Sequence, residues 1–519
     1  MQQAQQQLQL SGPYGQMFAD SQQIPLDIVG ANGFGRYDEI SISETFNMII
    51  SDGALVNFAG YELVASIAPN GVGRGVYNVI MLNKIAAVIN NGLYLIDTNN
   101  AFIRGGTLNT NSGNVYFADN EASQIGIVDG TWVYIYTYNV TPPTFQAFQI
   151  LSAIAGFTYA APVYIDYQDG RFIIADGNSN NFILSAVGNG LIWPPGTVTS
   201  PLPFANAVGQ IQTKPAKCMA AVALSRELIV FGQTFAEPWY DAGLQIFPYQ
   251  RDNFTAIDYG LVNQSTIGKL DNTICWLGVN EKSNISVYMM YLDNQPQRMS
   301  NDGLDYIFQN LKAPTDCYGF MYREAGHPYY QLTFVTDNLT YLFDLSSQPA
   351  QVFSLTDDMM NYHPARRVVY FNGSNYFVSL LDGNVYKMSS SITSYNGLVI
   401  PRIRTCSNIR WPDNARSVIQ AVHITMESGI NQNYIPTAQN LPDNTTTNYL
   451  SNRLDTSLSQ DGGYTFYNVS SMELPRTGMR RNALPIYNLG ATGNDITLRF
   501  RWNTLGRVVV SGGFISLRR

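Results

Sequence analysis

A repeated strand–turn–strand pattern constrains this chain more than any other feature of its sequence. In each copy, a strand of apolar residues is followed by a turn of Gly, Asn or Asp, and then by a second apolar strand. About seven copies follow one another, most of them roughly 45–55 residues apart, which is close to the period of β-propeller blades. The copies pair Ile85–Ile89 with Leu93–Ile96, Val115–Ala118 with Ile125–Val128, Phe172–Ala175 with Phe182–Leu184, Leu228–Phe231 with Pro238–Tyr240, Ile274–Leu277 with Ile285–Tyr288, Tyr330–Phe334 with Thr340–Phe343, and Tyr376–Leu380 with Asn384–Tyr386.

Such a unit can bury its faces only against a neighbouring unit, so a series of them either stacks openly or closes into a ring. Ring closure also removes the exposed sheet edges of an open stack. The composition agrees, since 13% of the residues are aromatic and only 13% are charged, a bias typical of short strands joined by tight turns. The sequence therefore predicts an all-β fold built on a multi-bladed β-propeller of about seven blades. Because the period is loose, a β-sandwich, or several of them, stays open as the alternative.

The repeat divides the chain into four segments. Residues 1–40, which begin with a Gln-rich tract, are expected to form an N-terminal arm or leader. Residues 41–75 hold strands that can belong to a second β domain, and residues 76–406 hold the propeller. In residues 407–519 the repeat ends and longer alternating strands follow, which predicts a smaller C-terminal β-sandwich-like domain with a loop insertion at 430–456.

One helix is predicted among the strands, over Asn301–Leu311. Asn301 and Asp302 are residue types that cap helix N-termini, and four apolar residues then follow at spacings of three and four. This helix is short, so we expect it to pack on an outer strand.

Charge is distributed unevenly along the chain. The whole chain carries a net charge of −8, but its last 44 residues hold eight arginines against one acid, Asp495, a net charge of +7 that leaves −15 on the rest. A basic end can meet phosphate or an acidic partner, whereas an acidic remainder repels nucleic acid. An ordinary solvated sheet face explains the basic end equally well. The eight arginines are Arg476, Arg480, Arg481, Arg499, Arg501, Arg507, Arg518 and Arg519.

Residues that carry catalysis or bind metals are scarce. None of the three histidines has a second histidine at metal-ligand spacing, and the four cysteines form no CxxC pair. Gly71–Gly75 resembles a phosphate-binding loop, but its glycine spacing is wrong and no Gly-Lys-Ser/Thr follows, so a tight turn is predicted there. We therefore expect no enzyme activity, no metal and no cofactor. Because no signal peptide and no long apolar span is present, we also expect no membrane-spanning segment.

The most specific motifs lie in the fourth copy of the pattern and directly after it. They resemble the packaged-DNA stabilisation or tail-hub (nozzle) proteins of short-tailed bacteriophages, the podoviruses, in which the same four motifs follow in this order. Arg298-Met-Ser300 before the predicted helix, the Arg74-Gly75 turn, Asp461–Gly463 and Arg499–Gly506 are also similar to signatures of that family. The four motifs are Phe231-Gly232, Glu237-Pro-Trp239-Tyr240, Gly260-Leu261 and Trp276-Leu277-Gly278.

The resemblance implies a structural protein of the virion tail that is assembled in the host cytoplasm. Six copies would form a ring, the nozzle or hub, that extends the DNA channel below the head-to-tail adaptor. This ring would retain the packaged genomic DNA and conduct it during ejection. The implied partners are further copies of the chain, the adaptor, tail fibres or spikes, a tail needle or plug, and the DNA in the lumen.

The motif residues are expected to have structural roles. Trp239 and Tyr240 should pack between blades, and Glu237 should satisfy a nearby polar group. Contacts with a partner or with DNA are expected, if anywhere, at basic residues of the C-terminal segment, because phosphate contacts come from Lys and Arg. These candidates are Arg476, Arg480, Arg481, Arg499, Arg501 and Arg507.

Two other functions stay open. A carbohydrate-binding or depolymerising propeller at the tail periphery would use pairs of carboxylates such as Asp357-Asp358. A fibre-adaptor protein would be equally non-enzymatic but would occupy a different position in the virion.

Overall fold

A computed structural model of the chain shows two compact units, formed by residues 59–396 and by residues 1–58 together with 397–519. The ranges whose structure is described are 21–36, 43–151, 158–194, 207–244, 247–252, 256–291, 295–411, 416–427, 452–475, 483–493 and 495–518.

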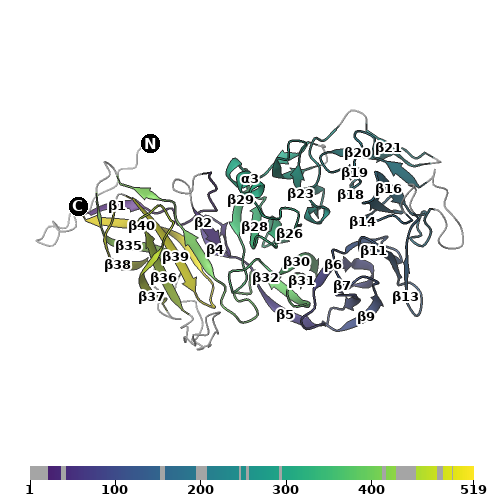
Figure 1. The fold of residues 1–519 in the computed structure, drawn as a ribbon. Helices are drawn as coiled ribbons and strands as arrows, with labels where there is room; N and C mark the ends of the chain where they lie inside the picture. The colour runs from purple at the N-terminus through teal and green to yellow at the C-terminus, as the bar shows by residue number, and fades with distance from the viewer. Residues whose placement is uncertain are drawn as a thin grey trace, which may run out of the picture. The chain divides into compact units, whose positions relative to one another are not determined.

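The larger unit is a β-propeller of antiparallel four-stranded blades (Figure 1). Six blades are separate sheets, and the strands β26 to β29 pair in the same order to give a further four-stranded unit. The strands of the first four blades are β6 Gly73–Val79, β7 Lys84–Ile89, β8 Gly92–Ile96, β9 Phe102–Thr107, β10 Tyr116–Asp119, β11 Gln124–Val128, β12 Val133–Thr137, β13 Thr144–Phe148, β14 Pro162–Gln168, β15 Arg171–Asp176, β16 Asn181–Leu184, β17 Val208–Gln210, β18 Ala220–Leu224, β19 Glu227–Phe231, β20 Ala236–Asp241 and β21 Tyr249–Arg251. The remaining strands are β22 Gly268–Leu270, β23 Thr273–Val279, β24 Ile285–Met290, β25 Gln297–Arg298, β26 Cys317–Glu324, β27 His327–Phe334, β28 Leu339–Asp344, β29 Gln351–Ser354, β30 Ala365–Phe371, β31 Ser374–Ser379, β32 Asn384–Ser389 and, from the start of the unit, β5 Gly60–Ser66.

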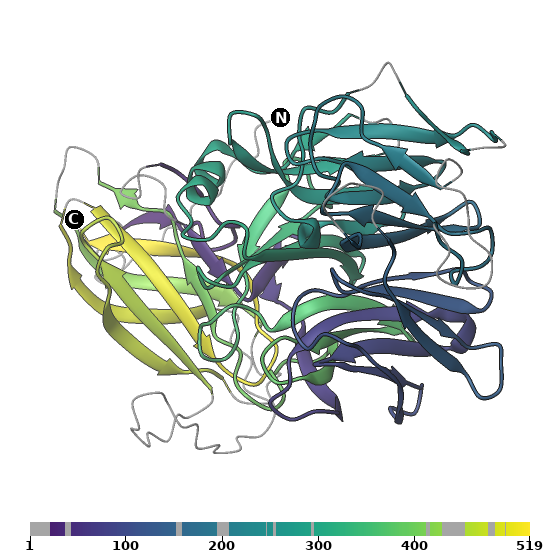
Figure 2. The ribbon, with the colours of Figure 1, turned by 45° about the vertical axis from the view of Figure 1, so that its right-hand side comes forward.

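The blades close into a ring. The first strand of each blade lies innermost, and β6 contacts β10 on one side and β30 on the other, which joins the first blade to the last. The last blade has the order β30-β31-β32-β5, so its outer strand comes from the beginning of the unit. The succession of blades can be followed by colour in Figure 2. The all-β propeller prediction is therefore confirmed, and each of the seven sequence repeats supplies two neighbouring strands of one four-stranded unit.

Turn chemistry explains several of the hairpins. The two-residue loop between β14 and β15 is Asp169-Gly170, with φ of 49° and 79°, and the loop between β30 and β31 is Asn372-Gly373, with φ of 45° and 76°. Positive φ at both positions matches the twist of the flanking strands, and Asp-Gly and Asn-Gly are the pairs that adopt it most easily.

Among the described residues, three short helices lie between propeller strands. η1 Ile80–Leu82 and η3 Gln264–Thr266 are single turns, and α3 is Asp302–Gln309. Helix α3 begins where the sequence predicts, because the side chain of Asn301 accepts a hydrogen bond from the backbone nitrogen of Leu304 at 2.8 Å.

The smaller unit is a β-sandwich. One sheet has the order β3-β4-β40-β35-β38, with β1 also paired to β40, and the other contains β2-β33-β39-β36-β37, with β34 paired to β39. Apolar side chains of both sheets, including Ile515 and Trp502, form one buried core. The strands are β1 Ser21–Pro25, β2 Glu44–Phe46, β3 Met48–Ser51, β4 Ala54–Asn57, β33 Arg402–Thr405, β34 Ile409–Arg410, β35 Val418–Met426, β36 Arg453–Ser459, β37 Tyr467–Glu473, β38 Ala483–Ala491, β39 Asp495–Asn503 and β40 Val509–Arg518.

The unit boundaries differ from the sequence-based ones in three places. The propeller begins at residue 59 instead of 76, because β5 and β6 pair within it, and it ends at residue 396 instead of 406. Part of the expected N-terminal arm is ordered as β1, which adds a strand beside β40. Most of the insertion predicted at 430–456 lies outside the described residues, and its last four residues belong to β36.

Candidate functional site

The innermost strands of the propeller surround an axial cavity of about 380 Å³. Side chains from β6, β10, β14, β22, β26 and β30 line it, so six blades contribute. The charged groups of its lining are Asp119, Glu121, Asp166, Lys269 and Arg367.

One ion pair crosses this cavity lining. The Nζ atom of Lys269 lies 2.8 Å from Oδ2 of Asp166, and the same carboxylate oxygen accepts a hydrogen bond from the backbone nitrogen of Ala223 at 2.8 Å. These contacts join β14 to β22 and β18, which belong to different blades. Asp166 and Lys269 therefore tie the inner strands together as well as line the cavity.

Burial changes the acidity of several groups in the cavity. It raises the pKa of the Asp119 carboxyl, which is also hydrogen-bonded to the backbone nitrogen of Glu121 at 2.9 Å. The pKa of the Tyr77 hydroxyl is raised chiefly by burial and further by Asp119, Asp166 and Glu121. Tyr77 therefore stays a neutral hydroxyl at ordinary pH.

The family-like motif residues gather in the seams between blades. Trp239 on β20 packs edge-on against Phe182 on β16, with ring centroids 5.2 Å apart, and Phe231 on β19 packs against Trp276 on β23 at 5.4 Å. Trp239, Phe231, Trp276 and the neighbouring Leu277 are all buried. Tyr240 differs from the expectation, because it is 41% exposed and its hydroxyl donates to the side chain of Gln250 instead of packing between blades.

Glu237 is a buried carboxylate with its acceptor positions occupied. Its Oε1 atom accepts hydrogen bonds from the backbone nitrogens of Gln212 (3.0 Å) and Thr213, and its Oε2 atom accepts one from Nε1 of Trp239 at 3.2 Å. Nη1 of Arg251 lies 3.8 Å from Oε1. Glu237 is 1% exposed, so it anchors the 212–213 segment and orients Trp239 without access to a ligand.

The three motif glycines allow close approach of other groups. A Cβ atom on Gly260 would lie 2.4 Å from backbone atoms of Gln233 and Thr234, and one on Gly278 would lie 2.6 Å from the ring of Tyr288. At Gly232 the obstacle is the ring of Phe235, at 2.7 Å. These positions therefore require glycine for packing.

The Arg298-x-Ser300 motif fixes helix α3 to the propeller. Its target is the buried carboxylate of Asp305 on α3, which accepts hydrogen bonds from the hydroxyls of Ser300 and Ser286. Nη2 of Arg298 lies 2.6 Å from Oδ2 of Asp305. The helix is thereby attached to β24 and β25 by charge-assisted bonds.

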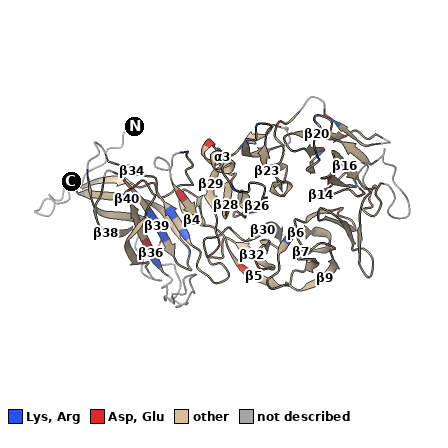
Figure 3. Ribbon diagram, in the orientation of Figure 1, with Lys and Arg blue, Asp and Glu red and all other residues tan. Residues whose placement is uncertain are grey.

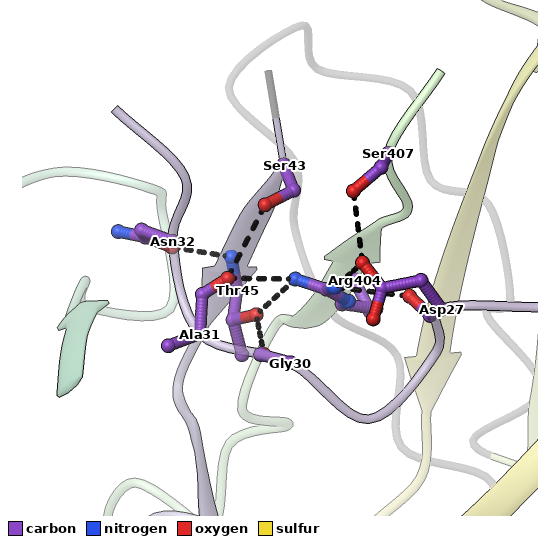
Figure 4. A network of polar contacts seen from close by, with 8 residues as sticks. All are labelled: Asp27, Gly30, Ala31, Asn32, Ser43, Thr45, Arg404 and Ser407. Carbon is purple, nitrogen blue, oxygen red and sulfur yellow. Dashed lines mark hydrogen bonds and ion pairs between the residues drawn. The ribbon is translucent and has the colours of Figure 1, made fainter. Parts of the chain in front are cut away.

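In the β-sandwich, a fully buried arginine on β33 holds a segment from the other end of the chain (Figure 4). Arg404 donates hydrogen bonds to the carbonyl oxygens of Ala31 (3.0 Å) and Asp27 (2.9 Å), to Oγ1 of Thr45 (2.9 Å) and to Oδ2 of Asp27 (3.2 Å). A Cβ atom on Gly30 would lie 2.3 Å from Nη2 of Arg404, so glycine permits this approach.

The expected basic contact residues are only partly described. Arg476, Arg480 and Arg481 lie outside the described residues. Figure 3 shows Lys and Arg on the strands around β39 and β36. The other three candidates each have a partner within the chain. These internal contacts already use part of their charge and hydrogen-bonding capacity. Arg499 pairs with Glu44 at 3.3 Å and stacks on Phe466, Arg501 donates to Asn503, and Arg507 pairs with Glu427 at 2.7 Å.

Asp357 and the four cysteines, which are further groups able to carry chemistry, occupy structural positions. No group of three or more His, Cys, Asp or Glu side chains in the described ranges is arranged to hold a metal ion. Asp357 caps its own turn, because Oδ1 accepts from the backbone nitrogens of Met359 and Asn361. All four cysteines are free and buried, and burial raises the pKa of the Cys406 thiol to about 12. Within these ranges, no helix has the length and hydropathy needed to span a membrane.

Comparison with known proteins identifies a family whose model covers the motif residues in the blade seams. The model of the family described as "Bacteriophage P22 Gp10, beta-propeller" matches residues 41–393. The chain belongs to this family. Membership supports a structural role in a phage tail and a location in the virion tail, and it agrees with the resemblance in the sequence. The match ends before most of the β-sandwich. No curated protein matches the chain.

Several solved structures share low similarity with the chain. A virginiamycin B lyase from Staphylococcus aureus, crystallised with quinupristin, is 10% identical with a TM-score of 0.41, over 63% of this chain and 99% of that chain. The extracellular domain of BT4673 from B. thetaiotaomicron is 10% identical with a TM-score of 0.42, over 85% of this chain and 58% of that chain. At this identity and TM-score they support no inference about activity.

Sequence reasoning missed the axial cavity. The sequence repeats correspond mainly to the second and third strands of each blade, whereas the cavity is lined by the first strands. A usable signal is present in the sequence, since Asp166 and Arg367 are charged residues within strands that are mostly apolar. What the sequence lacks is the ring geometry that brings such residues from different blades to one axis.

Proposed function

We propose that the chain is a ring-forming component of a short phage tail. In this proposal six copies surround the tail axis below the head-to-tail adaptor, extend the DNA channel, retain the packaged genome and conduct it during ejection. Tail fibres or spikes and a needle or plug attach to the same ring. Assembly takes place in the host cytoplasm.

The match of residues 41–393 to the phage tail propeller family carries this proposal. The site geometry supports it, because the motif residues serve blade packing: Glu237 and Asp305 have their carboxylates occupied by internal donors. A ring is compatible with heterologous contacts between copies, which close when the rotation between copies divides the circle.

Electrostatics supports a channel role for the acidic part of the chain. The residues before the last 44 carry a net charge of −15. A negatively charged wall repels the phosphate backbone, so DNA slides past it without being held. The arginines of the last 44 residues would then meet the neighbouring copies or other tail proteins.

Electron microscopy of virions tests the proposal. The expected result is density for six copies of the propeller around the tail axis, directly below the head-to-tail adaptor. Particles made without the chain should fill with DNA and then lose it, measured as nuclease-sensitive genome. Density at the tail periphery, attached to a fibre, would favour the fibre-adaptor function instead, and full retention of DNA without the chain would contradict the retention role.

A further inference from the structure

The axial cavity of the propeller is used by none of the roles described above. It reaches solvent, because Glu121 and Lys269 on its lining are exposed. Its volume of about 380 Å³ lies within the range of roughly 300–1,000 Å³ that is typical of small-molecule pockets.

Three tyrosine hydroxyls on the cavity lining form no hydrogen bond with the described residues. Tyr164 is 5% exposed and lines the cavity, and no described residue forms a hydrogen bond with its hydroxyl. The hydroxyls of Tyr77 and Tyr167, on the same lining, likewise form none with the described residues. Each of these hydroxyls can donate one hydrogen bond and accept others, so a ligand that carries hydroxyl groups finds partners on the lining.

The charges of the lining disfavour a simple ion. Three acids and two bases face the cavity, and one acid and one base, Asp166 and Lys269, already neutralise each other. A cation would be repelled by Arg367, and an anion by Asp119 and Glu121. A neutral ligand avoids both repulsions and can still accept from Arg367 and donate to the carboxylates.

From these observations we propose that the axial cavity binds a small, neutral, hydroxyl-rich molecule of the saccharide class. Its hydroxyls would pair with Tyr164, Arg367 and Asp119, and its C–H faces would pack on the tyrosine rings. Binding alone is proposed, with no chemical step. The proposal does not rest on the position of the protein in the tail.

Isothermal titration calorimetry of the full chain tests this site. The probes are glucose, galactose, N-acetylglucosamine and maltose, with putrescine as an amine and inorganic phosphate as an anion. We expect at least one saccharide to bind, and neither ion to bind more tightly. Tyr164→Phe removes one hydroxyl and should weaken saccharide binding about fivefold or more, the loss expected for one hydrogen bond.

Two further variants make the result specific. Arg367→Gln should weaken the same saccharide by a similar factor, and Arg367 is partly exposed, so its replacement should leave the fold intact. Tyr159→Phe is the matched control, because Tyr159 is 41% exposed and lies outside the cavity lining. The proposal is overturned if none of the four saccharides binds, if putrescine or phosphate binds more tightly, or if neither Tyr164→Phe nor Arg367→Gln weakens binding.

Discussion

The propeller and the β-sandwich are built from contacts of very different sequence separation. In the propeller, each blade except the last comes from one continuous stretch, and the buried Arg74 holds the loop at 110–113, fewer than 40 residues away. In the sandwich, the contact of Arg404 with Asp27 spans 377 residues, and that of Arg499 with Glu44 spans 455. The two units therefore carry different entropic costs of closure.

The propeller itself removes most of that cost for the sandwich. Its two chain ends are adjacent, because the backbone nitrogen of Asn396 donates to the carbonyl of Tyr61 at 2.7 Å and the rings of Tyr61 and Tyr395 stack at 4.5 Å. We call this contact, with the buried His363 and Phe377 beside it, the closing seam. Once it forms, residues 58 and 397 are close together, and the two parts of the sandwich can meet. The comparison predicts that damage to the propeller harms both units, whereas damage to the sandwich stays local.

The largest effect is expected for Arg74→Ala. Arg74 is 2% exposed and donates five hydrogen bonds, to the carbonyls of Asn90, Thr110, Ser112 and Gly113 and to the Thr110 hydroxyl. Bonds from a charged group stabilise by about 1.5–3 kcal/mol each, so the loss should exceed ~4 kcal/mol.

Hydrogen exchange followed by mass spectrometry checks this. Protection should fall in the propeller and also in the sandwich. The control is Arg104→Ala in the same blade, which is exposed and should change little. If the sandwich keeps full protection in Arg74→Ala, the proposed dependence of one unit on the other is wrong.

A somewhat smaller effect is expected for Trp239→Ala. Removing this buried ring from the seam with Phe182 should lower the free energy of unfolding by about 3–5 kcal/mol. Tyr240→Ala is the matched control, since Tyr240 is the next residue but is exposed, and should cost less than about 1 kcal/mol. Urea denaturation measures both. A soluble, equally stable Trp239→Ala protein would contradict the structural role of the motif.

Arg404→Lys should act on the sandwich alone. Lysine keeps the charge but cannot reach the separate acceptors on residues 27, 31 and 45, so a loss of about 2–3 kcal/mol is expected. Proteolysis should then cut within residues 21–36 while the propeller stays resistant. Arg501→Lys, on the exposed face of β39, should behave as wild type. If the propeller of Arg404→Lys also became sensitive to proteolysis, damage to the sandwich would not stay local, contrary to the comparison.

Acid should weaken the closing seam. Burial lowers the pKa of His363 to about 3, below its value of 6.5 in the unfolded chain. Below pH 6.5 the unfolded state takes up a proton that the folded state refuses, so His363 costs about 1.4 kcal/mol of stability per pH unit down to pH 3. In His363→Phe, the stability measured between pH 7 and pH 4 should fall less steeply than in wild type. Equal slopes would show that His363 is not the group that responds.

The smallest effect is expected for Arg507→Gln. Its ion pair with Glu427 is largely exposed, so its loss should cost between about 0 and 1 kcal/mol. The same variant also tests whether Arg507, in the basic C-terminal segment, contacts DNA. If Arg507 contacts DNA, binding of duplex DNA by the full chain should weaken and its salt dependence should become shallower, measured by fluorescence anisotropy. No change in binding would remove Arg507 from the contact candidates.

Local sequence patterns are sufficient to predict the blades and to identify the family. The alternation of apolar strands with Asp-Gly and Asn-Gly turns such as Asp169-Gly170 is local information, because a turn pair and its flanking strands dictate a hairpin. The motif from Phe231 to Gly278 identified the family for the same reason, since its glycines and aromatic rings pack within two neighbouring blades.

The pairing of distant segments cannot be predicted from such local patterns and is known from the folded structure. Periodicity placed β5 outside the propeller, whereas pairing with β32 makes it the outer strand of the last blade. It treated residues 21–36 as an arm, whereas β40 and Arg404 hold them in the sandwich. It also gave no sign of the axial cavity. In each case the partners lie far apart in the chain, and a local pattern specifies that a strand has an apolar face without specifying which segment covers it.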